Sequence, residues 1–132
     1  MSFRALIVDD SPAMRGFVRR VLDASGLELG AVFEAADGLE ALDLLAREWV
    51  DVILTDINMP RMDGETLVAK LAQSPAHAAV PVIVVSTDST AARREQLLSR
   101  GVRGYLAKPF TPEMLREEIE KVMEAVCPLN RL

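Results

Sequence analysis

The sequence has few of the residues that form disulfides or bind soft metals. Among its 132 residues, Cys127 is the only cysteine and His77 is the only histidine. One cysteine cannot form an intrachain disulfide or a cysteine-based zinc site, and one histidine cannot form a multi-histidine metal site. We expect no chemical role for Cys127. His77 has no partner at a useful spacing, so we expect its side chain to be solvent-exposed.

Long hydrophobic segments are also missing. The longest nearly apolar run, residues 78–85, contains Pro81 and is far shorter than the roughly 20 residues of a membrane span. Only four consecutive apolar residues precede the aspartate pair that begins at Asp9, so the start does not resemble a secretory signal peptide. We expect a cytoplasmic protein with a reduced cysteine and no membrane partner.

Basic residues are outnumbered by acidic ones. The chain has 15 basic and 20 acidic residues and a net charge of −5, whereas proteins that bind nucleic acid by bulk electrostatics present a basic face. We therefore expect no direct nucleic-acid contact. Half of the residues are apolar and 27% are charged, a globular composition with enough length for the core of one domain. We assign residues 1–127 to this domain and residues 128–132 to a C-terminal tail.

Short apolar runs alternate with segments of helical periodicity. Strands are predicted at residues 5–8, 29–34, 51–56, 81–85 and 104–107, and helices at residues 38–48, 66–73 and 90–100. Two more helices should open at Ser11-Pro12 and Thr111-Pro112, where a capping hydroxyl precedes proline. Five strands that alternate with five helices call for a parallel sheet covered on both faces, a three-layer α/β sandwich. The residues expected on the solvent face of the first helix are Arg15, Arg19 and Arg20.

Polar side chains follow the predicted strands at the point where each one ends. The residues after the first, third, fourth and fifth strands are Asp9 and Asp10, Asp56, Ser86 and Thr87, and Lys108. In an open parallel sheet the ligand site lies beyond the carboxyl ends of the strands, so these side chains should converge at one edge. Taken singly, each of them is also typical of a helix cap, a turn or a solvated lysine.

This combination of groups indicates phosphoryl chemistry. Three clustered carboxylates repel one another unless a cation lies among them, and oxygen ligands of this kind suit Mg²⁺. A carboxylate beside a bound divalent ion can act as a nucleophile toward phosphorus and form an acyl phosphate. The metal, a hydroxyl and an ammonium group would share the charge of the phosphoryl oxygens. The pattern therefore predicts phosphorylation of Asp56.

Four segments extend this interpretation to a family. They read VDDS at 8–11, DINMPRMDG at 56–64, VST at 85–87 and YLAKPF at 105–110. With these segments in this order, the chain from about Arg4 to Cys127 resembles a response-regulator receiver domain, similar to the single-domain, CheY-like chemotaxis regulators. The resemblance implies a flavodoxin-like (βα)5 fold with strand order 2-1-3-4-5. It also implies a switch in two-component signalling rather than a conventional enzyme.

The resemblance implies specific roles for the acidic residues. Asp56 would accept a phosphoryl group from a phosphohistidine of a sensor histidine kinase or phosphotransfer protein, and the domain would catalyse its own phosphorylation and dephosphorylation. Asp10 would be the main carboxylate ligand of Mg²⁺, with Asp9 acting largely through water. Asp56 itself and the backbone carbonyl of Asn58 would complete the metal site.

The resemblance also implies a switch. Ser86, rather than Thr87, keeps the family's separation from the lysine and would hydrogen-bond one phosphoryl oxygen, while Lys108 pairs with another. The Lys108–Pro109 peptide bond should be cis. Tyr105 would turn inward as Ser86 moves and would change the face formed by the fourth helix, fifth strand and fifth helix, where a downstream protein binds. The alternative for Tyr105 is an ordinary half-buried tyrosine with a wet hydroxyl.

Asn58 and Asp88 lie two residues beyond the acceptor and the hydroxyl residue. An amide and an acid at these positions resemble the family members that lose their phosphoryl group quickly, so we expect a short-lived signal. The alternative is that both side chains bond loop backbone.

Other residues lie away from this edge. Trp49 precedes the third strand, roughly 20 Å from Asp56 at strand rise, and should pack in the core or at its rim. A basic group around the fourth helix and fifth strand is either a solvated face or a contact for an acidic partner; it consists of Arg93, Arg94, Arg100 and Arg103.

Three other functions are alternatives to the switch. A Mg²⁺ phosphohydrolase with an aspartyl phosphate needs a second aspartate two residues after the first, where this chain has Asn58. A receiver-like module without phosphorylation predicts a broken acidic set, which is not found here. A receiver fragment of a larger DNA-binding regulator or hybrid kinase stays open, as does the choice between a monomer and a phosphorylation-dependent dimer.

Overall fold

The computed structural model describes residues 2–87 and 90–126. They form one five-stranded parallel sheet in the order β2-β1-β3-β4-β5. The strands are β1 (Phe3–Val8), β2 (Leu29–Ala35), β3 (Val52–Thr55), β4 (Val82–Ser86) and β5 (Gly104–Ala107). The fold class and the strand order implied by the resemblance are therefore confirmed. Asp88, Cys127 and the tail at 128–132, for which the sequence made predictions, lie outside the described residues.

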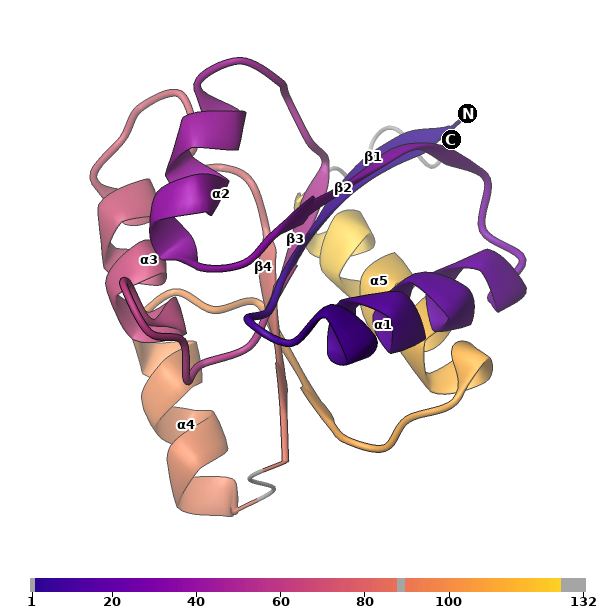
Figure 1. Cartoon of the computed structure of the whole chain (residues 1–132). Coiled ribbons are helices and arrows are strands. Elements are labelled where there is room, and N and C mark those ends of the chain that lie inside the picture. The colour runs from indigo at the N-terminus through magenta and orange to yellow at the C-terminus, as the bar shows by residue number, and fades with distance from the viewer. Residues whose placement is uncertain (1, 88–89, 127–132) are drawn as a thin grey trace.

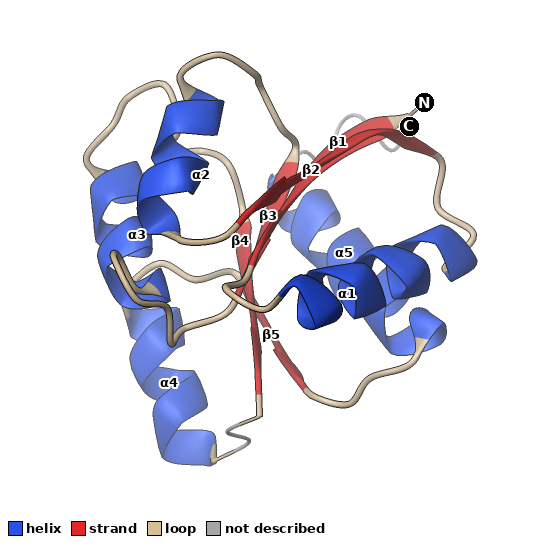
Figure 2. Cartoon of the chain, in the orientation of Figure 1, coloured by secondary structure: helices blue, strands red, loops and turns tan. Residues whose placement is uncertain are grey.

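Helices cover both faces of the sheet, as Figure 1 shows. The helices are α1 (Pro12–Ala24), α2 (Gly38–Leu45), α3 (Gly64–Ala72), α4 (Ala91–Ser99) and α5 (Pro112–Val126). One face carries α1 and α5, and the other carries α2, α3 and α4. The loops that follow β1, β3 and β5 leave the same end of the sheet (Figure 2). No helix among residues 2–87 and 90–126 is long and apolar enough to cross a membrane.

The two faces of the sheet build two hydrophobic cores, because successive residues of a strand point to opposite sides. In β1, Leu6 and Val8 belong to the core under α2, α3 and α4, whereas Ala5 and Ile7 belong to the core under α1 and α5. The central strand β3 is buried along its whole length. Its continuous apolar sequence is typical of a parallel strand covered on both faces.

Side-chain caps set the starts of the helices. The Ser11 hydroxyl accepts a hydrogen bond from the Met14 amide at 3.2 Å, and the Thr111 hydroxyl accepts one from Met114 at the same distance. These two helix openings were predicted from the sequence and are confirmed. α3 begins two residues earlier than predicted, because Asp63 accepts from the amide of Thr66 at 2.8 Å and caps the helix.

Three expectations about individual residues were wrong. His77 is half-buried rather than exposed, since its Nε2 donates to the carbonyl of Leu45 at 3.1 Å and its Nδ1 shares a hydrogen bond with the Ser74 hydroxyl at 3.0 Å. Arg15, expected on the solvent face of α1, has a side chain that is only 17% exposed. Trp49, expected in the core or at its rim, is 62% exposed and belongs to neither core of the described residues; the Arg4 guanidinium lies 4.4 Å from its ring centroid.

Candidate functional site

Three carboxylates meet beyond the carboxyl ends of β1 and β3. Asp9 and Asp10 follow β1, Asp56 follows β3, and one carboxylate oxygen from each lies within 4.8 Å of the others. The Lys108 ammonium, which follows β5, lies 3.3 Å from Asp9 Oδ2 and 3.7 Å from Asp56 Oδ2. Parallel pairing in register brings these residues together although they are far apart in the sequence.

The three acids differ in exposure. Asp9 is buried and its carboxylate is held on both oxygens, because Oδ1 accepts from the Ser11 amide at 2.9 Å and Oδ2 pairs with Lys108. Asp56 is partly buried, and Asp10 is exposed. The site therefore has a fixed, buried acid at its base and an exposed acid at its mouth. An exposed carboxylate can bind a hydrated ion with little desolvation, which agrees with the role that the resemblance gives to Asp10.

Asp56 is anchored through its backbone and through one carboxylate oxygen. Its amide donates to the carbonyl of Val8 at 2.9 Å, and its Oδ1 accepts from the Ile57 amide at 2.7 Å. Burial raises the pKa of Asp56 above its ordinary value. The charge of Asp9 adds to this rise, whereas the Ile57 amide and Lys108 oppose it. A cation among the three acids would lower the pKa again and favour the ionised, nucleophilic form.

The donor set fits a small divalent cation. It consists of carboxylate oxygens only, from a buried, a partly buried and an exposed residue. Mg²⁺ prefers such oxygens and keeps several of its waters, which the exposed side of the site leaves room for. Asn58, expected to supply a backbone carbonyl, is exposed in the loop two residues after Asp56.

Ser86 ends β4, and Lys108 directly follows the neighbouring strand β5. Ser86 is the last residue of β4 and is buried, whereas Thr87 is exposed. The amide of Lys108 donates to the carbonyl of Ser86 at 2.8 Å, which fixes the two residues relative to each other. The peptide bond between Lys108 and Pro109 is cis, as predicted.

Tyr105 lies on β5 with its side chain in a core. It is 6% exposed and belongs to the core that also contains Val84 and Leu97. The half-buried position considered from the sequence is therefore not the one observed, and the ring is already turned inward. The Tyr105 amide, on the edge strand, donates to Glu118 Oε2 of α5 at 3.2 Å.

The first residue of α3 packs directly on the backbone of Asp56. The amide of Gly64 donates to the carbonyl of Ile57 at 2.8 Å. A Cβ at Gly64 would collide with the backbone carbonyl oxygen of Asp56. The glycine of the DINMPRMDG segment is thus required for the close approach of α3 to the end of β3.

An apolar cavity of about 310 Å³ opens beside the lysine. It is lined by Met14, Phe17, Thr87, Lys108 and Pro109. The ring of Phe17 meets that of Phe110 edge-on at 5.4 Å, which links α1 to the loop after β5.

Three residues that brace the site were not predicted from the sequence: Arg15, Asp37 and Arg61. Arg61 pairs with Asp37, and Arg15 contacts the backbone of Asp9. The N-cap position of Asp37 before Gly38 is a recognisable sequence signal, but the partner of each arginine depends on tertiary packing. Of the basic group expected around α4 and β5, Arg93 of α4 and the capping residue Arg100 pair with Glu65 of α3, whereas Arg94 and Arg103 are exposed.

Comparison with known proteins agrees with this geometry. Residues 5–120 match the family model of the response regulator receiver domain. The chemotaxis protein CheY homolog of Campylobacter jejuni is 40% identical over 121 residues, which cover 91% of this chain and 92% of that protein. A stretch of the sensor histidine kinase TmoS of Ectopseudomonas mendocina is 38% identical over 120 residues, 91% of this chain but 12% of that protein.

Solved structures give the same result. The chemotaxis response regulator CheY4 of Vibrio cholerae superposes with a TM-score of 0.81 at 33% identity, covering 92% of this chain and 99% of that one. The strand order and the acidic cluster lead to the same family as these similarities. The chain belongs to the response regulator receiver domain family.

Proposed function

We propose that this receiver domain takes a phosphoryl group onto Asp56 from a phosphohistidine of a sensor kinase or phosphotransfer protein. The observation that carries the proposal is the set of three carboxylates within 4.8 Å, with the Lys108 ammonium 3.7 Å from Asp56. A carboxylate oxygen of Asp56 attacks phosphorus, the phosphorus–nitrogen bond breaks, and the imidazole leaves and takes a proton from water. The product is an acyl phosphate.

The residues around Asp56 would have two roles, binding the metal ion and pairing with the phosphoryl group. Asp9, Asp10, Asp56 and the Asn58 carbonyl would hold Mg²⁺, and the ion would neutralise charge on the phosphoryl oxygens. Lys108, now shared between two carboxylates, is near enough to pair with a phosphoryl oxygen on Asp56. This chemistry takes place on the domain itself, so the protein is a phosphoacceptor and not a conventional enzyme.

We further propose that the signal leaves through the surface of α4, β5 and α5. Ser86, at the end of β4, would move toward the phosphoryl group, and Tyr105 and Pro109 on the adjoining strand and loop would transmit the change. A phosphoryl group can shift only an equilibrium between states that already exist. Arg94 and Arg103 are exposed on this surface and are suited to an acidic partner.

The similarity to chemotaxis regulators favours a stand-alone regulator of that type, which would act in the cytoplasm where a kinase can reach it. The similarity to part of TmoS supports a second candidate function, that of a receiver domain within a larger kinase or regulator. By the resemblance to rapidly dephosphorylated family members, Asn58 and Asp88 would shorten the lifetime of the acyl phosphate. Dimerisation, if it occurs, would depend on phosphorylation.

Phosphorylation by a small donor tests the proposal. Wild type and Asp56→Asn are incubated with phosphoramidate, with and without Mg²⁺, and measured by intact mass. The proposal expects the mass of one phosphoryl group on wild type only, and only with Mg²⁺. An unchanged wild-type mass, or equal labelling of the variant, would contradict it. Sustained hydrolysis of phosphate esters would instead favour a phosphohydrolase.

A further inference from the structure

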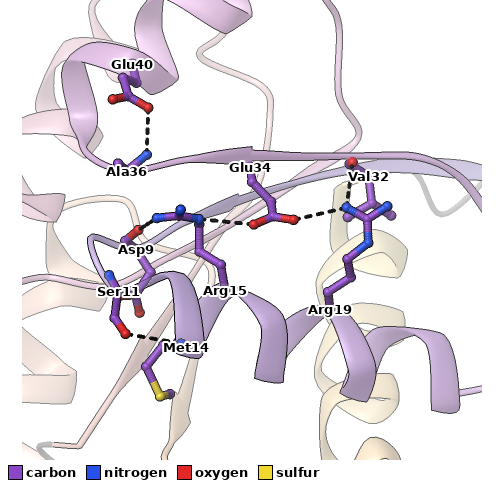
Figure 3. A network of polar contacts seen from close by, with 9 residues as sticks. All are labelled: Asp9, Ser11, Met14, Arg15, Arg19, Val32, Glu34, Ala36 and Glu40. Carbon is purple, nitrogen blue, oxygen red and sulfur yellow. Dashed lines mark hydrogen bonds and ion pairs between the residues drawn. The ribbon is translucent and has the colours of Figure 1, made fainter.

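Arg15 lies against the backbone of the acidic loop. Its Nη1 donates to the carbonyl oxygen of Asp9 at 2.6 Å, and its Nε donates to Glu34 Oε1 at 3.1 Å (Figure 3). The side chain is 17% exposed, far less than that of Arg19 one turn later, at 45%. Arg15 thus bridges β2 and the loop between β1 and α1.

Glu34 holds the arginine in place. It projects from β2, and its two carboxylate oxygens accept from Arg15 and Arg19 at 3.1 Å each. Arg19 also donates to the carbonyl of Val32 at 3.4 Å but makes no contact with Asp9 (Figure 3). A planar guanidinium held by a charged partner on one edge presents its other donors in a fixed direction.

The contact completes the fixation of Asp9. Its amide donates to the carbonyl of Ala35 at 3.0 Å, and its carboxylate is held by Ser11 and Lys108. The carbonyl is the remaining polar group, and Arg15 holds it. This carbonyl belongs to the planar peptide unit that joins Asp9 to Asp10, and the unit includes the Cα of Asp10, so fixing the carbonyl helps to fix where the exposed Asp10 begins.

We propose that Arg15 is a positioning residue for the magnesium site, acting on Asp10 through the Asp9–Asp10 peptide. This inference rests on the proposed magnesium site. Arg15 donates to backbone and to Glu34, and it touches neither the carboxylates of the site nor a phosphoryl group on Asp56. Its role is to keep the exposed ligand preorganised, as residues behind metal ligands do elsewhere.

Electrostatics alone predicts the opposite effect on binding. Removing a positive charge near three carboxylates strengthens their attraction for a cation. Loss of positioning weakens binding, by about 10-fold for residues that orient metal ligands. The sign of the change in Mg²⁺ affinity therefore separates the two effects. Arg19 is the matched control, because it binds the same Glu34 and lies on the same helix without touching Asp9.

The test is Mg²⁺ titration by calorimetry on unphosphorylated wild type, Arg15→Gln, Arg15→Lys and Arg19→Gln at one ionic strength. The proposal expects about 10-fold weaker binding for Arg15→Gln, a partial loss for Arg15→Lys, and no loss for Arg19→Gln. Thermal unfolding without Mg²⁺ checks that each variant is folded. If Arg15→Gln does not fold, Arg15→Lys carries the comparison, since it keeps the charge but loses the fork of donors.

Three results would overturn the inference. Binding by Arg15→Gln as tight as, or tighter than, that of wild type shows that the contact has no positioning role. Equal weakening in the Arg15 and Arg19 variants assigns the effect to Glu34 and the helix rather than to Asp9. Failure of wild type to bind Mg²⁺ overturns the proposed metal site and the inference with it. This outcome differs from the other two because it is seen in the unsubstituted protein.

Discussion

Arg61 donates from Nε to Asp37 Oδ2 at 2.6 Å, which joins the loop after β3 to the start of α2. The amide of Gly38 reinforces the link by donating to the carbonyl of Met62 at 3.0 Å. Asp37 is buried and also caps α2, because its Oδ1 accepts from the Glu40 amide at 2.9 Å. One carboxylate thus holds both a helix and the loop that follows Asp56.

Asp37→Ala is expected to lower the free energy of unfolding by about 1 kcal/mol through the loss of the cap alone. Asp37→Asn keeps a capping oxygen and should cost less. Urea unfolding at neutral pH measures both, with Asp43→Asn as control because its pair with Arg47 is exposed. Equal stability of Asp37→Ala and Asp43→Asn would show that Asp37 does not brace these elements.

The same residue should make stability depend on pH. The hydrogen bond from the Glu40 amide lowers the pKa of Asp37 below its ordinary value of 3.8, with Arg61 contributing. A carboxyl group whose pKa is lower in the folded state stabilises the fold above its unfolded pKa, and this stability is lost as the pH falls through the folded pKa. The difference between wild type and Asp37→Asn should therefore shrink below pH 3.8. A difference that stays constant in acid would contradict the assignment.

Asp56 should change the pH dependence of stability in the opposite direction to Asp37. Burial raises its pKa above the ordinary value, so the fold loses stability as the pH rises above the unfolded pKa, and the loss is complete above the folded pKa. Without Mg²⁺, Asp56→Asn should be more stable than wild type at neutral pH, and the gain should vanish in acid. Unfolding curves with and without chelator measure this, with Asp23→Asn on exposed α1 surface as control. A less stable Asp56→Asn at neutral pH would argue against the burial cost.

Gly64→Ala tests the close approach of α3 to the acceptor. The added Cβ would collide with the Asp56 carbonyl oxygen, so we expect a loss of roughly 1–3 kcal/mol of stability, typical of overpacking. Gly30→Ala on β2 is the matched control, because there the nearest atom to the new Cβ is 3.4 Å away. Equal stability of the two variants in urea would mean that α3 can shift without strain.

Asn58→Lys should lengthen the life of the acyl phosphate, because we assign to Asn58 a place beside the attacking water. The decay of phosphorylated wild type and variant is followed by intact mass after the donor is removed. Pro60→Ala, at another exposed position of the same loop, is the control for a general change in the loop. Equal lifetimes of wild type and Asn58→Lys would count against the role.

The features that could be predicted from the sequence are those that depend on where strands end and helices begin. Asp9, Asp56 and Lys108 could be placed together because parallel strands bring their carboxyl ends to one edge. Ser11 and Thr111 could be recognised as caps because the signal is local. Local patterns carry no information on the partner of a long side chain, so the burial of Arg15 and the hydrogen bonds of His77 were not foreseen.

The phosphoacceptor can be identified directly by chemical trapping. The phosphorylated protein is reduced with borohydride, which converts an aspartyl phosphate to homoserine, and the peptides are then sequenced. The account predicts homoserine at position 56 alone, and only when Mg²⁺ was present with the donor. Homoserine at position 9 or 10, or none at any aspartate, would contradict it.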